Sequence, residues 1–379
     1  MATWHIISAE YPPQNGGVAD YTRLIARGLA SRGDRVHVWA PALTDPGPAE
    51  AGVEVHGLPR GFGPRTLATL SRGLDAAGPG HILLQYVPQA FGMKGMNLPL
   101  CLWLLVRRRA GIFIMFHEVA VSLTWRQPLR HNLIGVVNCA MAFVLVRAAR
   151  RCFVAGAIWE QRLRPLAPAT AEISWLPVPS NVPVVDDPAG VLAVRRKLTV
   201  EGGMVVGHFG TAREAWTAAR LADVVPRLLR QRTEVVFLLL GRDSLDMRRR
   251  LLAGAPELHN RLLASGPLVP ADISRRLRAC DVMLQPYGDG VSTRRTTLMA
   301  ALAHHRAVLT TSGVSTEPLW EQSGAVALVD TDDAVAMSTA LAHLMDDSDE
   351  RVRLGAAAGA IYTQRFDISH TIAALRGYC

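Results

Sequence analysis

The sequence predicts an α/β protein made of two Rossmann-like domains, each built on a parallel sheet. Three observations lead to this prediction. Short apolar runs alternate with longer stretches of helical periodicity, which is typical of βαβ units. Residues 176–183 contain three prolines and interrupt both periodicities near mid-chain, as a connector between domains would. The length of 379 residues fits two domains, at roughly 150 residues for each.

The first domain is predicted to begin with a strand over residues 4–8. Apolar residues then recur at helical spacing from Val18 to Leu29, and Gly33 predicts the end of that helix. Further strands are expected at residues 35–40, 53–58, 81–86, 112–116, 152–155 and 173–176. The apolar run over residues 132–146 is shorter than the roughly 18 to 20 residues that a membrane-spanning helix needs. It is predicted to be a buried helix.

After the proline-rich segment the alternation starts again. Strands of the second domain are expected at residues 205–209, 235–240, 282–284, 307–310 and 326–328. The carboxyl ends of parallel strands meet at one edge of a sheet, and ligands of such sheets bind there. The residues that follow each strand are therefore the first candidates for a functional site.

The composition is that of a globular protein, with 49% hydrophobic and 19% charged residues. The net charge of +9 is uneven, because residues 1–183 carry 18 basic and 10 acidic side chains. This excess predicts an acidic partner. An anionic membrane surface or a lipid-linked acceptor beside Arg107-Arg108-Arg109 and Arg147, Arg150 and Arg151 is one reading, and an ordinary basic face is another. Nucleic acid is disfavoured, because no recognised binding motif is present.

The five cysteines are odd in number, lie far apart and show no CxxC spacing, so they predict neither a disulfide framework nor a zinc site. The N-terminus enters a strand pattern directly, without the features of a secretion signal. The expected location is cytoplasmic, with peripheral association at the inner face of the membrane if the basic face binds lipid.

Two groups of residues in the first domain follow predicted strands. Gly16-Gly17 stands where the first loop meets the first helix, and paired glycines there let backbone N–H groups approach an anion. The alternative is an ordinary βα turn. His117 and Glu118 follow the strand over residues 112–116, where a histidine can hydrogen-bond a sugar hydroxyl or a phosphate and a carboxylate can orient it. A surface histidine is the alternative here.

The second domain offers two comparable turns. Gly210 follows its first strand, and Arg213 next to it could pair bidentately with a diphosphate. Residues 285–303 contain a strand end, a glycine loop, a capping residue at Ser292 or Thr293, and a helix with Arg294 and Arg295 in its first turn. Cations at that end of a helix are unfavourable by about 0.3 to 1 kcal/mol each, and a bound anion would remove the conflict. The alternative is that both arginines pair with Asp289.

In their order along the chain, these features resemble retaining nucleotide-sugar glycosyltransferases of the GT-B fold, family 4 type. The features that carry the resemblance are the Gly16-Gly17 loop, His117, the proline-rich segment, Phe209-Gly210 and residues 289–306. The resemblance implies two Rossmann-like domains facing a cleft. It implies an acceptor-binding domain over residues 1–183, a nucleotide-sugar-binding domain over residues 184–366, and a C-terminal helix within residues 367–379 that packs on the first domain.

The resemblance also implies roles for single residues. The expected catalytic residues are His117, Arg213 and Asp289. The expected donor-binding residues are Gly16, Gly17, Gly210, Gly290, Val291, Ser292, Thr293, Arg294 and Arg295. The expected acceptor-side residues are Glu10, Asn15 and Glu118. No cofactor or metal is expected, because the nucleotide-diphosphate sugar is itself the substrate.

The chain departs from the family pattern at one important place. Family members usually have two glutamates eight positions apart in the second domain, and here these positions are Ser292 and Ala300. The Ser-x-Arg-Arg version resembles a divergent branch, in which Asp289, Ser292 and the two arginines hold the donor by other contacts.

The expected reaction moves a sugar from a nucleotide-diphosphate sugar to a glycan, lipid-linked or small-molecule acceptor, with retention, as in polysaccharide or cell-envelope glycan biosynthesis. The departing diphosphate gains negative charge, so the arginines and the helix N-terminus near Ser292 would stabilise it. One alternative is a sugar-nucleotide epimerase, which needs more catalytic acids and bases than the sequence offers. The other is a degenerate, non-catalytic subunit that has lost donor binding together with the glutamates.

Overall fold

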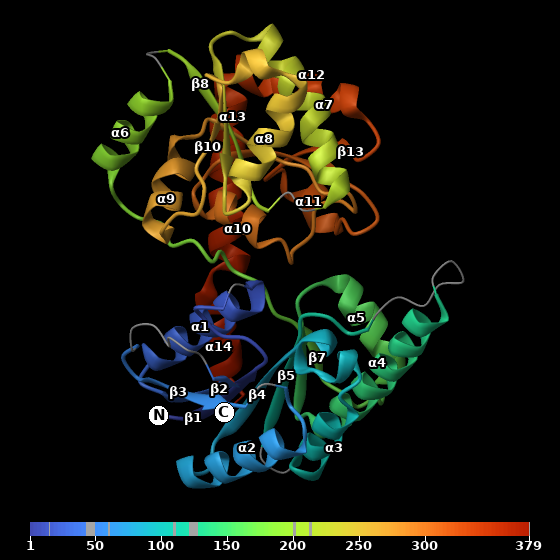
Figure 1. The fold of residues 1–379 in the computed structure, drawn as a ribbon. Coiled ribbons are helices and arrows are strands. Elements are labelled where there is room, and N and C mark those ends of the chain that lie inside the picture. Colours follow the sequence, from blue (N-terminus) through green and yellow to red (C-terminus); the bar gives the residue numbers. More distant parts are fainter. Residues whose placement is uncertain are drawn as a thin grey trace. The chain divides into compact units, whose positions relative to one another are not determined.

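The computed structural model describes residues 1–14, 16–42, 50–59, 61–108, 111–120, 128–199, 202–211 and 214–378. The chain forms two compact units (Figure 1). The first unit is Met1–Val178 with Ile368–Cys379, and the second is Pro179–Asp367. The chain thus leaves the first unit inside the proline-rich segment and returns to it for its last helix.

The first unit contains a seven-stranded parallel sheet in the order β3-β2-β1-β4-β5-β6-β7. Its strands are β1 (Thr3–Ser8), β2 (Arg35–Pro41), β3 (Val53–Leu58), β4 (His81–Tyr86), β5 (Ile112–Phe116), β6 (Arg151–Val154) and β7 (Ile173–Trp175). The strands predicted for this domain are confirmed, with ends within one residue. Every residue of β5 is buried, because helices cover both faces of a parallel sheet.

The helices of the first unit are α1 (Gly17–Ala30), α2 (Pro64–Ala77), α3 (Leu98–Val106), α4 (Leu129–Ala148), α5 (Ala157–Leu163) and α14 (Ile368–Arg376). Short 3-10 turns occupy Pro88–Phe91, Met93–Gly95 and Arg164–Leu166. Figure 1 shows α14 in red beside α1 in dark blue. Ile372 of α14 lies so close to Gly28 of α1 that a Cβ on Gly28 would collide with it. Arg376 also pairs with the fully buried carboxylate of Asp34 at 3.0 Å.

The second unit contains a six-stranded parallel sheet in the order β10-β9-β8-β11-β12-β13. Its strands are β8 (Met204–Phe209), β9 (Val235–Leu240), β10 (Leu262–Ala264), β11 (Val282–Gln285), β12 (Ala307–Ser312) and β13 (Ala327–Asp330). The strands predicted for this domain are confirmed within two residues. The edge strand β10 was not predicted, because three residues carry too little periodicity to be distinguished from a loop.

The helices of the second unit are α6 (Pro188–Leu198), α7 (Ala215–Gln231), α8 (Ser244–Gly254), α9 (Pro270–Ala279), α10 (Thr296–Ala303), α11 (Pro318–Ser323), α12 (Ala334–Asp346) and α13 (Ser348–Ile361). A 3-10 turn at Pro256–Leu258 and a π-helical turn at Tyr362–Phe366 complete it. The amphipathic helix α7 buries Leu221, Val225 and Leu229 against the sheet core. The short apolar helix α10 is almost wholly buried from Leu298 to Ala303, so its backbone direction is firmly set.

Both sheets change direction at one point in their strand order. In the first unit this switch lies between β1 and β4, and in the second unit between β8 and β11. At such a switch the loops that follow the two neighbouring strands run to opposite faces and leave a crevice for a ligand. The predicted candidate residues that follow β1, β8 and β11 therefore lie at the positions where an open α/β sheet binds its ligand.

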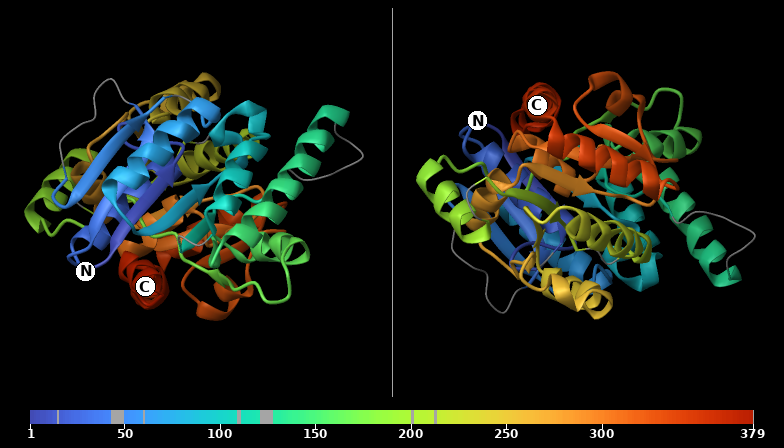
Figure 2. Two further views of the ribbon diagram at one scale, coloured as in Figure 1. Left: turned by 90° about the horizontal axis from the view of Figure 1, so that it is seen from below. Right: turned by 90° about the horizontal axis from the view of Figure 1, so that it is seen from above.

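Helix α4 differs from the sequence-based expectation. Among the described residues it is the one helix whose length and composition would allow it to cross a membrane, but only 33% of its most apolar window is buried. The expectation of a buried helix over residues 132–146 is therefore wrong for most of that window. Figure 2 shows one end of α4 extending away from the rest of the first unit, where fewer neighbours can cover it.

Candidate functional site

The carboxyl edge of the first sheet brings together residues from β1, β4 and β5. Ser8 of β1 is the register partner of Gln85 of β4, and Gln85 accepts a hydrogen bond from Nε2 of His117 at 2.8 Å. The ring of Tyr21 packs edge-on against the His117 ring, with centroids 5.0 Å apart. His117 is thus held in one orientation at the carboxyl end of β5, which neighbours β4 at the switch point.

Burial lowers the pKa of His117 to about 3. The imidazole is therefore neutral at physiological pH. Its Nε2 proton is used in the bond to Gln85, so the ring can contribute a hydrogen bond to a ligand through Nδ1 but does not bring a positive charge. This chemistry suits recognition of a sugar hydroxyl better than neutralisation of a phosphate.

The N-terminus of α1 is already associated with a carboxylate. Oε1 of Glu10 accepts a hydrogen bond from the backbone N–H of Ala19 at 3.1 Å, and burial raises the pKa of this carboxyl although the Ala19 and Val18 amides oppose the shift. A Cβ on Gly16 would collide with the Glu10 carboxylate, whereas a Cβ on Gly17 would meet nothing within 4 Å. A side chain at position 16 would therefore have to displace the Glu10 carboxylate from its bond to the Ala19 amide, whereas the space beside Gly17 is open.

Two of the predicted residues, Asn15 and Arg213, lie outside the described residues. Glu118 follows His117 and is partly buried. In the first unit the structure therefore gathers Glu10, Gly16, Gly17 and His117 at one edge of the sheet.

In the second unit, Asp289 joins the two arginines that the sequence singles out. Its carboxylate accepts from Arg294 at 2.8 Å, from Arg295, and from the Ser315 hydroxyl at 3.0 Å. Burial of Asp289 opposes its ionisation, but Arg295, the Ser315 hydroxyl and Arg294 together outweigh burial and lower its pKa. The alternative in which both arginines pair with Asp289 is therefore what the structure shows.

The arginines are not in the first turn of the following helix, contrary to the prediction. Helix α10 begins at Thr296, and Arg295 is its N-cap residue, without a side-chain cap bond within the described part of the chain. The loop extends two residues further than predicted because Thr293 is tied to Glu317, which accepts from its backbone N–H at 3.1 Å and its hydroxyl at 2.8 Å.

Several donors in this loop remain unused. Ser292 Oγ, Arg294 Nε and Arg295 Nε are buried and have no hydrogen-bond partner among the described residues. A buried donor without a partner costs about 1–3 kcal/mol. These donors stand next to the positive end of the α10 dipole, where the first N–H groups of a helix have no partner within it. The site is therefore suited to an anion with several oxygen atoms.

The glycines at the same edge allow the backbones to approach closely. Gly290 has a φ of +89°, and a Cβ there would collide with Gly313 and Thr316. Val291, which donates to the Thr311 carbonyl at 2.7 Å, is fully buried. Gly210 follows β8, and a Cβ there would lie 3.5 Å from Nε2 of His208. These residues shape the loop around the arginines.

Other residues of this site were not predicted from the sequence. The Arg295 guanidinium lies over the ring of Tyr287 at 4.5 Å, and the Tyr287 hydroxyl bonds Thr297 at 3.0 Å. Glu214 also pairs with Arg295 at 3.4 Å. Glu317 and Ser315 come from the loop after β12, and no local pattern in the sequence links that loop to residues 24 to 26 positions earlier. Tyr287 could have been found, because it directly follows the strand end.

Comparison with known proteins identifies the class of fold. Residues 203–347, within the second unit, match the family model described as Glycosyl transferases group 1. The chain is similar over 100% of its length to sucrose-phosphate synthase from Thermosynechococcus elongatus, with 98% of that chain covered, a TM-score of 0.72 and 16% identity. It is equally similar to HepE of Anabaena, solved in complex with UDP and glucose, with 99% of that chain covered, a TM-score of 0.71 and 16% identity.

A third similar structure is a putative UDP-N-acetylglucosamine 2-epimerase from Listeria monocytogenes, with a TM-score of 0.61, 13% identity, and 99% and 97% of the two chains covered. No curated protein sequence matches the chain significantly. At these identities the comparisons define the fold. The protein has the two Rossmann-like domains of the GT-B fold, and its second unit carries a segment similar to group 1 glycosyl transferases.

The two neighbouring glycines of the first loop should respond differently to substitution. Gly16→Ala places a methyl group against the Glu10 carboxylate and should destabilise the first unit by about 1–3 kcal/mol. Gly17→Ala meets open space and should leave stability unchanged or slightly raised. Urea unfolding of both variants measures this difference, and equal stability of the two would contradict the internal role of Gly16.

The neutral state of His117 should be visible in the pH dependence of stability. Its pKa is about 3 in the folded chain but roughly 6.5 when unfolded, so the unfolded chain binds the proton more readily and stability falls as pH drops below about 6.5. His117→Gln should reduce this loss by up to about 1.4 kcal/mol per pH unit.

Hydrogen exchange of the β5 amides between pH 7 and pH 5 measures the effect in the first unit. His343→Gln, at a side chain that is 65% exposed, serves as the control and should retain the wild-type pH dependence. An unchanged dependence in His117→Gln would show that His117 titrates normally.

Proposed function

We propose that the protein is a glycosyltransferase that moves a sugar from a nucleotide-diphosphate sugar to an acceptor, with retention of anomeric configuration. The observation that carries this proposal is the cluster of Asp289, Arg294 and Arg295 at the β8–β11 switch point, with unused donors beside the start of α10. The family match of residues 203–347 supports it independently.

The donor half of the reaction is assigned to the second unit. Breaking the anomeric bond leaves negative charge on the diphosphate, which needs donors that are already in place. Two guanidinium groups share the carboxylate of Asp289, and Arg295 also pairs with Glu214, so the formal charges of these four groups balance and the guanidinium N–H donors without a partner remain for the diphosphate. In our proposal these donors, Ser292 and the α10 N-terminus take the place of the two family glutamates in holding the donor. Since these groups hold the diphosphate, the proposed reaction requires no metal.

In the first unit, His117 is proposed to contact the transferred sugar. Its neutral ring, held by Gln85 and Tyr21, offers hydrogen bonding without charge. Glu10 and Glu118, with Asn15, are proposed to lie on the acceptor side. Retention is proposed to occur without a protein nucleophile, because the positive charge that develops on the sugar is balanced by the adjacent leaving diphosphate.

A second candidate is a binding subunit that has lost catalysis. It is favoured by one observation, that the positions of the two family glutamates hold Ser292 and Ala300, both of which are buried. Such a subunit would not bind a nucleotide sugar productively, and the next experiment separates the two candidates.

Arginine substitutions test the donor site. A hydrogen bond to a charged group contributes about 1.5–3 kcal/mol, so Arg294→Ala and Arg295→Ala should each weaken nucleoside diphosphate binding by about 10-fold or more. Each single variant leaves Asp289 with one arginine and Ser315, so the thermal midpoint should change little. The measurement is calorimetric titration with the best ligand from a thermal-shift screen of UDP, GDP, ADP, dTDP and CMP and their sugar conjugates.

Arg249→Ala is the matched control, because Arg249 belongs to the same unit, pairs with one carboxylate and is 78% exposed. It should bind nucleotide as the wild type does. Unchanged nucleotide affinity in both test variants would show that Arg294 and Arg295 do not bind the donor. Folded wild-type protein that binds none of the nucleotides would favour the non-catalytic subunit.

We further propose that the acceptor is presented at an anionic membrane, on which α4 docks. Six exposed residues of α4 recur on one face, and all but the last are apolar; Arg130 is exposed beside this face. The six are Leu129, Leu133, Val136, Ala140, Phe143 and Arg147. Exposed apolar residues gathered on one face commonly mark an interaction surface. The packed neighbour α3 adds Leu102 and Val106, which are 47% and 82% exposed.

The charged residues around this face are almost all basic. Between residues 76 and 159 the sequence holds nine arginines and lysines, and Glu118 is the one acidic residue of that range. Arg147 lies over the Phe143 ring at 3.3 Å and Arg107 over the Trp103 ring at 4.3 Å. Apolar side chains flanked by arginines are the pattern of a helix that lies in the membrane interface and is attracted to anionic lipid.

Vesicle binding tests this docking. The double variant Leu133→Gln with Val136→Gln should bind phosphatidylglycerol vesicles about 10-fold or more weakly than the wild type. The reason is that two apolar side chains that would enter the membrane are replaced by polar ones. Leu245→Gln, at a side chain that is 51% exposed in the second unit, is the control and should bind normally. Cosedimentation at low and high salt is the measurement. Equal binding of the test variant and the wild type would refute the docking role of α4.

A further inference from the structure

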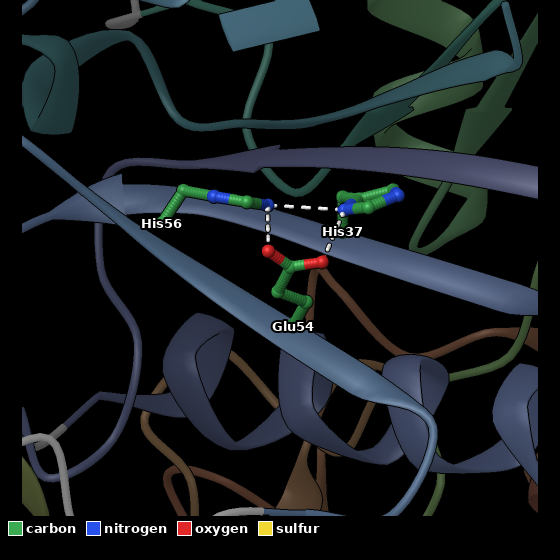
Figure 3. Close-up of side chains that lie close together, drawn as sticks. All are labelled: His37, Glu54 and His56. Carbon is green, nitrogen blue, oxygen red and sulfur yellow. Dashed lines mark hydrogen bonds and ion pairs between the residues drawn. The ribbon is translucent and has the colours of Figure 1, made fainter. Parts of the chain in front are cut away.

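Three side chains at one margin of the first sheet converge on a common point (Figure 3). They are His37 of β2 and Glu54 and His56 of the edge strand β3. The three residues lie within β2 and β3, whereas Glu10 and His117 follow the carboxyl ends of β1 and β5. The cluster is therefore separate from the site described above.

The strand register explains why these residues meet. β2 and β3 are parallel, with His37 beside Glu54 and Trp39 beside His56. Alternate residues of a strand point to the same face, so Glu54 and His56 share the face of their neighbours His37 and Trp39. Two residues of an edge strand and one of the next strand thereby present three polar ends to one point.

The spacing of the three ends fits a metal ion. Nδ1 of His37 lies 3.0 Å from Nε2 of His56 and 3.3 Å from Oε2 of Glu54, and Nε2 of His56 lies 3.7 Å from Oε1 of Glu54. A tetrahedral zinc ion with bonds of about 2.1 Å separates its ligand atoms by about 3.4 Å. The observed separations bracket this value.

The cluster also lacks hydrogen-bond donors. When both rings are neutral, one ring proton lies between His37 and His56 and forms the single hydrogen bond of that contact. The Glu54 carboxylate has no proton to donate, so it can only accept. His37 is 4% exposed, and its other nitrogen, Nε2, has no partner in the described part of the chain. The contacts with Glu54 and His56 are thus its only polar contacts there. A divalent cation would satisfy the lone pairs of all three groups at once.

Neighbouring aromatic rings hold the two imidazoles in place. Trp39 stacks on His56 with centroids 4.0 Å apart and planes at 13°, and His5 stacks on His37 at 5.2 Å and 19°. His5 itself bonds the Gly78 carbonyl through Nε2 at 3.0 Å and the Trp39 indole through Nδ1 at 3.4 Å. Both of its nitrogens are used, so His5 supports the cluster without joining it.

We propose that His37, Glu54 and His56 bind a divalent transition-metal ion of the zinc class, which cross-links the edge strand β3 to β2. Two imidazoles and a carboxylate are a ligand set that zinc commonly accepts with water in the fourth position. The Glu54 side chain is 67% exposed, so that position is open to solvent. The cysteines predict no zinc site, and this cluster contains no cysteine.

The test uses the full chain without an affinity tag, because added histidines would bind the same ions. After removal of metal with EDTA, titration with zinc against a chromophoric chelator should give one saturable site per chain. Glu54→Gln and His56→Gln should weaken this binding by at least about 10-fold, a loss seen even when only an outer partner of a metal ligand is removed. Cobalt should give the visible absorption of a four-coordinate ion in the wild type and not in the variants.

His259→Gln removes an exposed histidine of the second unit and should bind zinc as the wild type does. Thermal unfolding in EDTA establishes that all variants are folded. Zinc should also slow hydrogen exchange of the β3 amides in the wild type. The proposal is overturned if wild-type protein shows no saturable zinc binding, or if Glu54→Gln and His56→Gln bind zinc as tightly as His259→Gln. Neither readout depends on the enzymatic activity proposed above.

Discussion

The reversal of strand order in each sheet is the constraint on which the functional arrangement depends. β1 and β4, and again β8 and β11, are neighbours at which the strand order reverses. In open α/β sheets the loops after two such strands run to opposite faces, and ligands bind between them at the carboxyl edge. Residues far apart in the sequence, such as Ser8 and Gln85, become register partners there. The side chains with unusual electrostatics, His117 and Asp289, both follow strands at these edges, so the topology decides where chemistry is available.

In our proposal the ion pairs of Asp289 also prepare the donor-binding site. One carboxylate fixes two guanidinium groups by single bonds to each, which orders the arginines without saturating them. The stacking of Arg295 on Tyr287 adds rigidity, and the remaining Nε donors stay buried without a partner among the described residues. Pairing with Asp289 and binding of an anion are therefore compatible functions of the same residues.

The sequence predicted the regular elements well and the long-range contacts poorly. Strands such as β5 and β9 are continuous apolar runs whose pattern alone defines them, whereas the three-residue strand β10 has no such pattern. Local signals located Asp289, Arg294 and Arg295, but the start of α10 was placed too early because Glu317, a distant residue, holds Thr293 in the loop. The exposure of α4 was likewise not predicted, since composition shows that a helix is apolar but does not show which neighbours cover it.

The contrast between two helix N-termini bears on which unit holds the anionic donor. At α1 the Glu10 carboxylate already accepts a hydrogen bond from the Ala19 amide, so a phosphate there would meet a negative charge. That repulsion is removed only if Glu10 moves away or takes up a proton, and its raised pKa favours the second. At α10 no carboxylate caps the helix among the described residues, and the carboxylates nearby, Asp289, Glu214 and Glu317, are paired with Arg294, Arg295 and Thr293. Since every helix dipole attracts anions at its N-terminus, the dipole does not distinguish α1 from α10, and the neighbouring charges decide between them. On this ground we propose that the diphosphate binds at α10 and that the edge near α1 binds uncharged sugar hydroxyls.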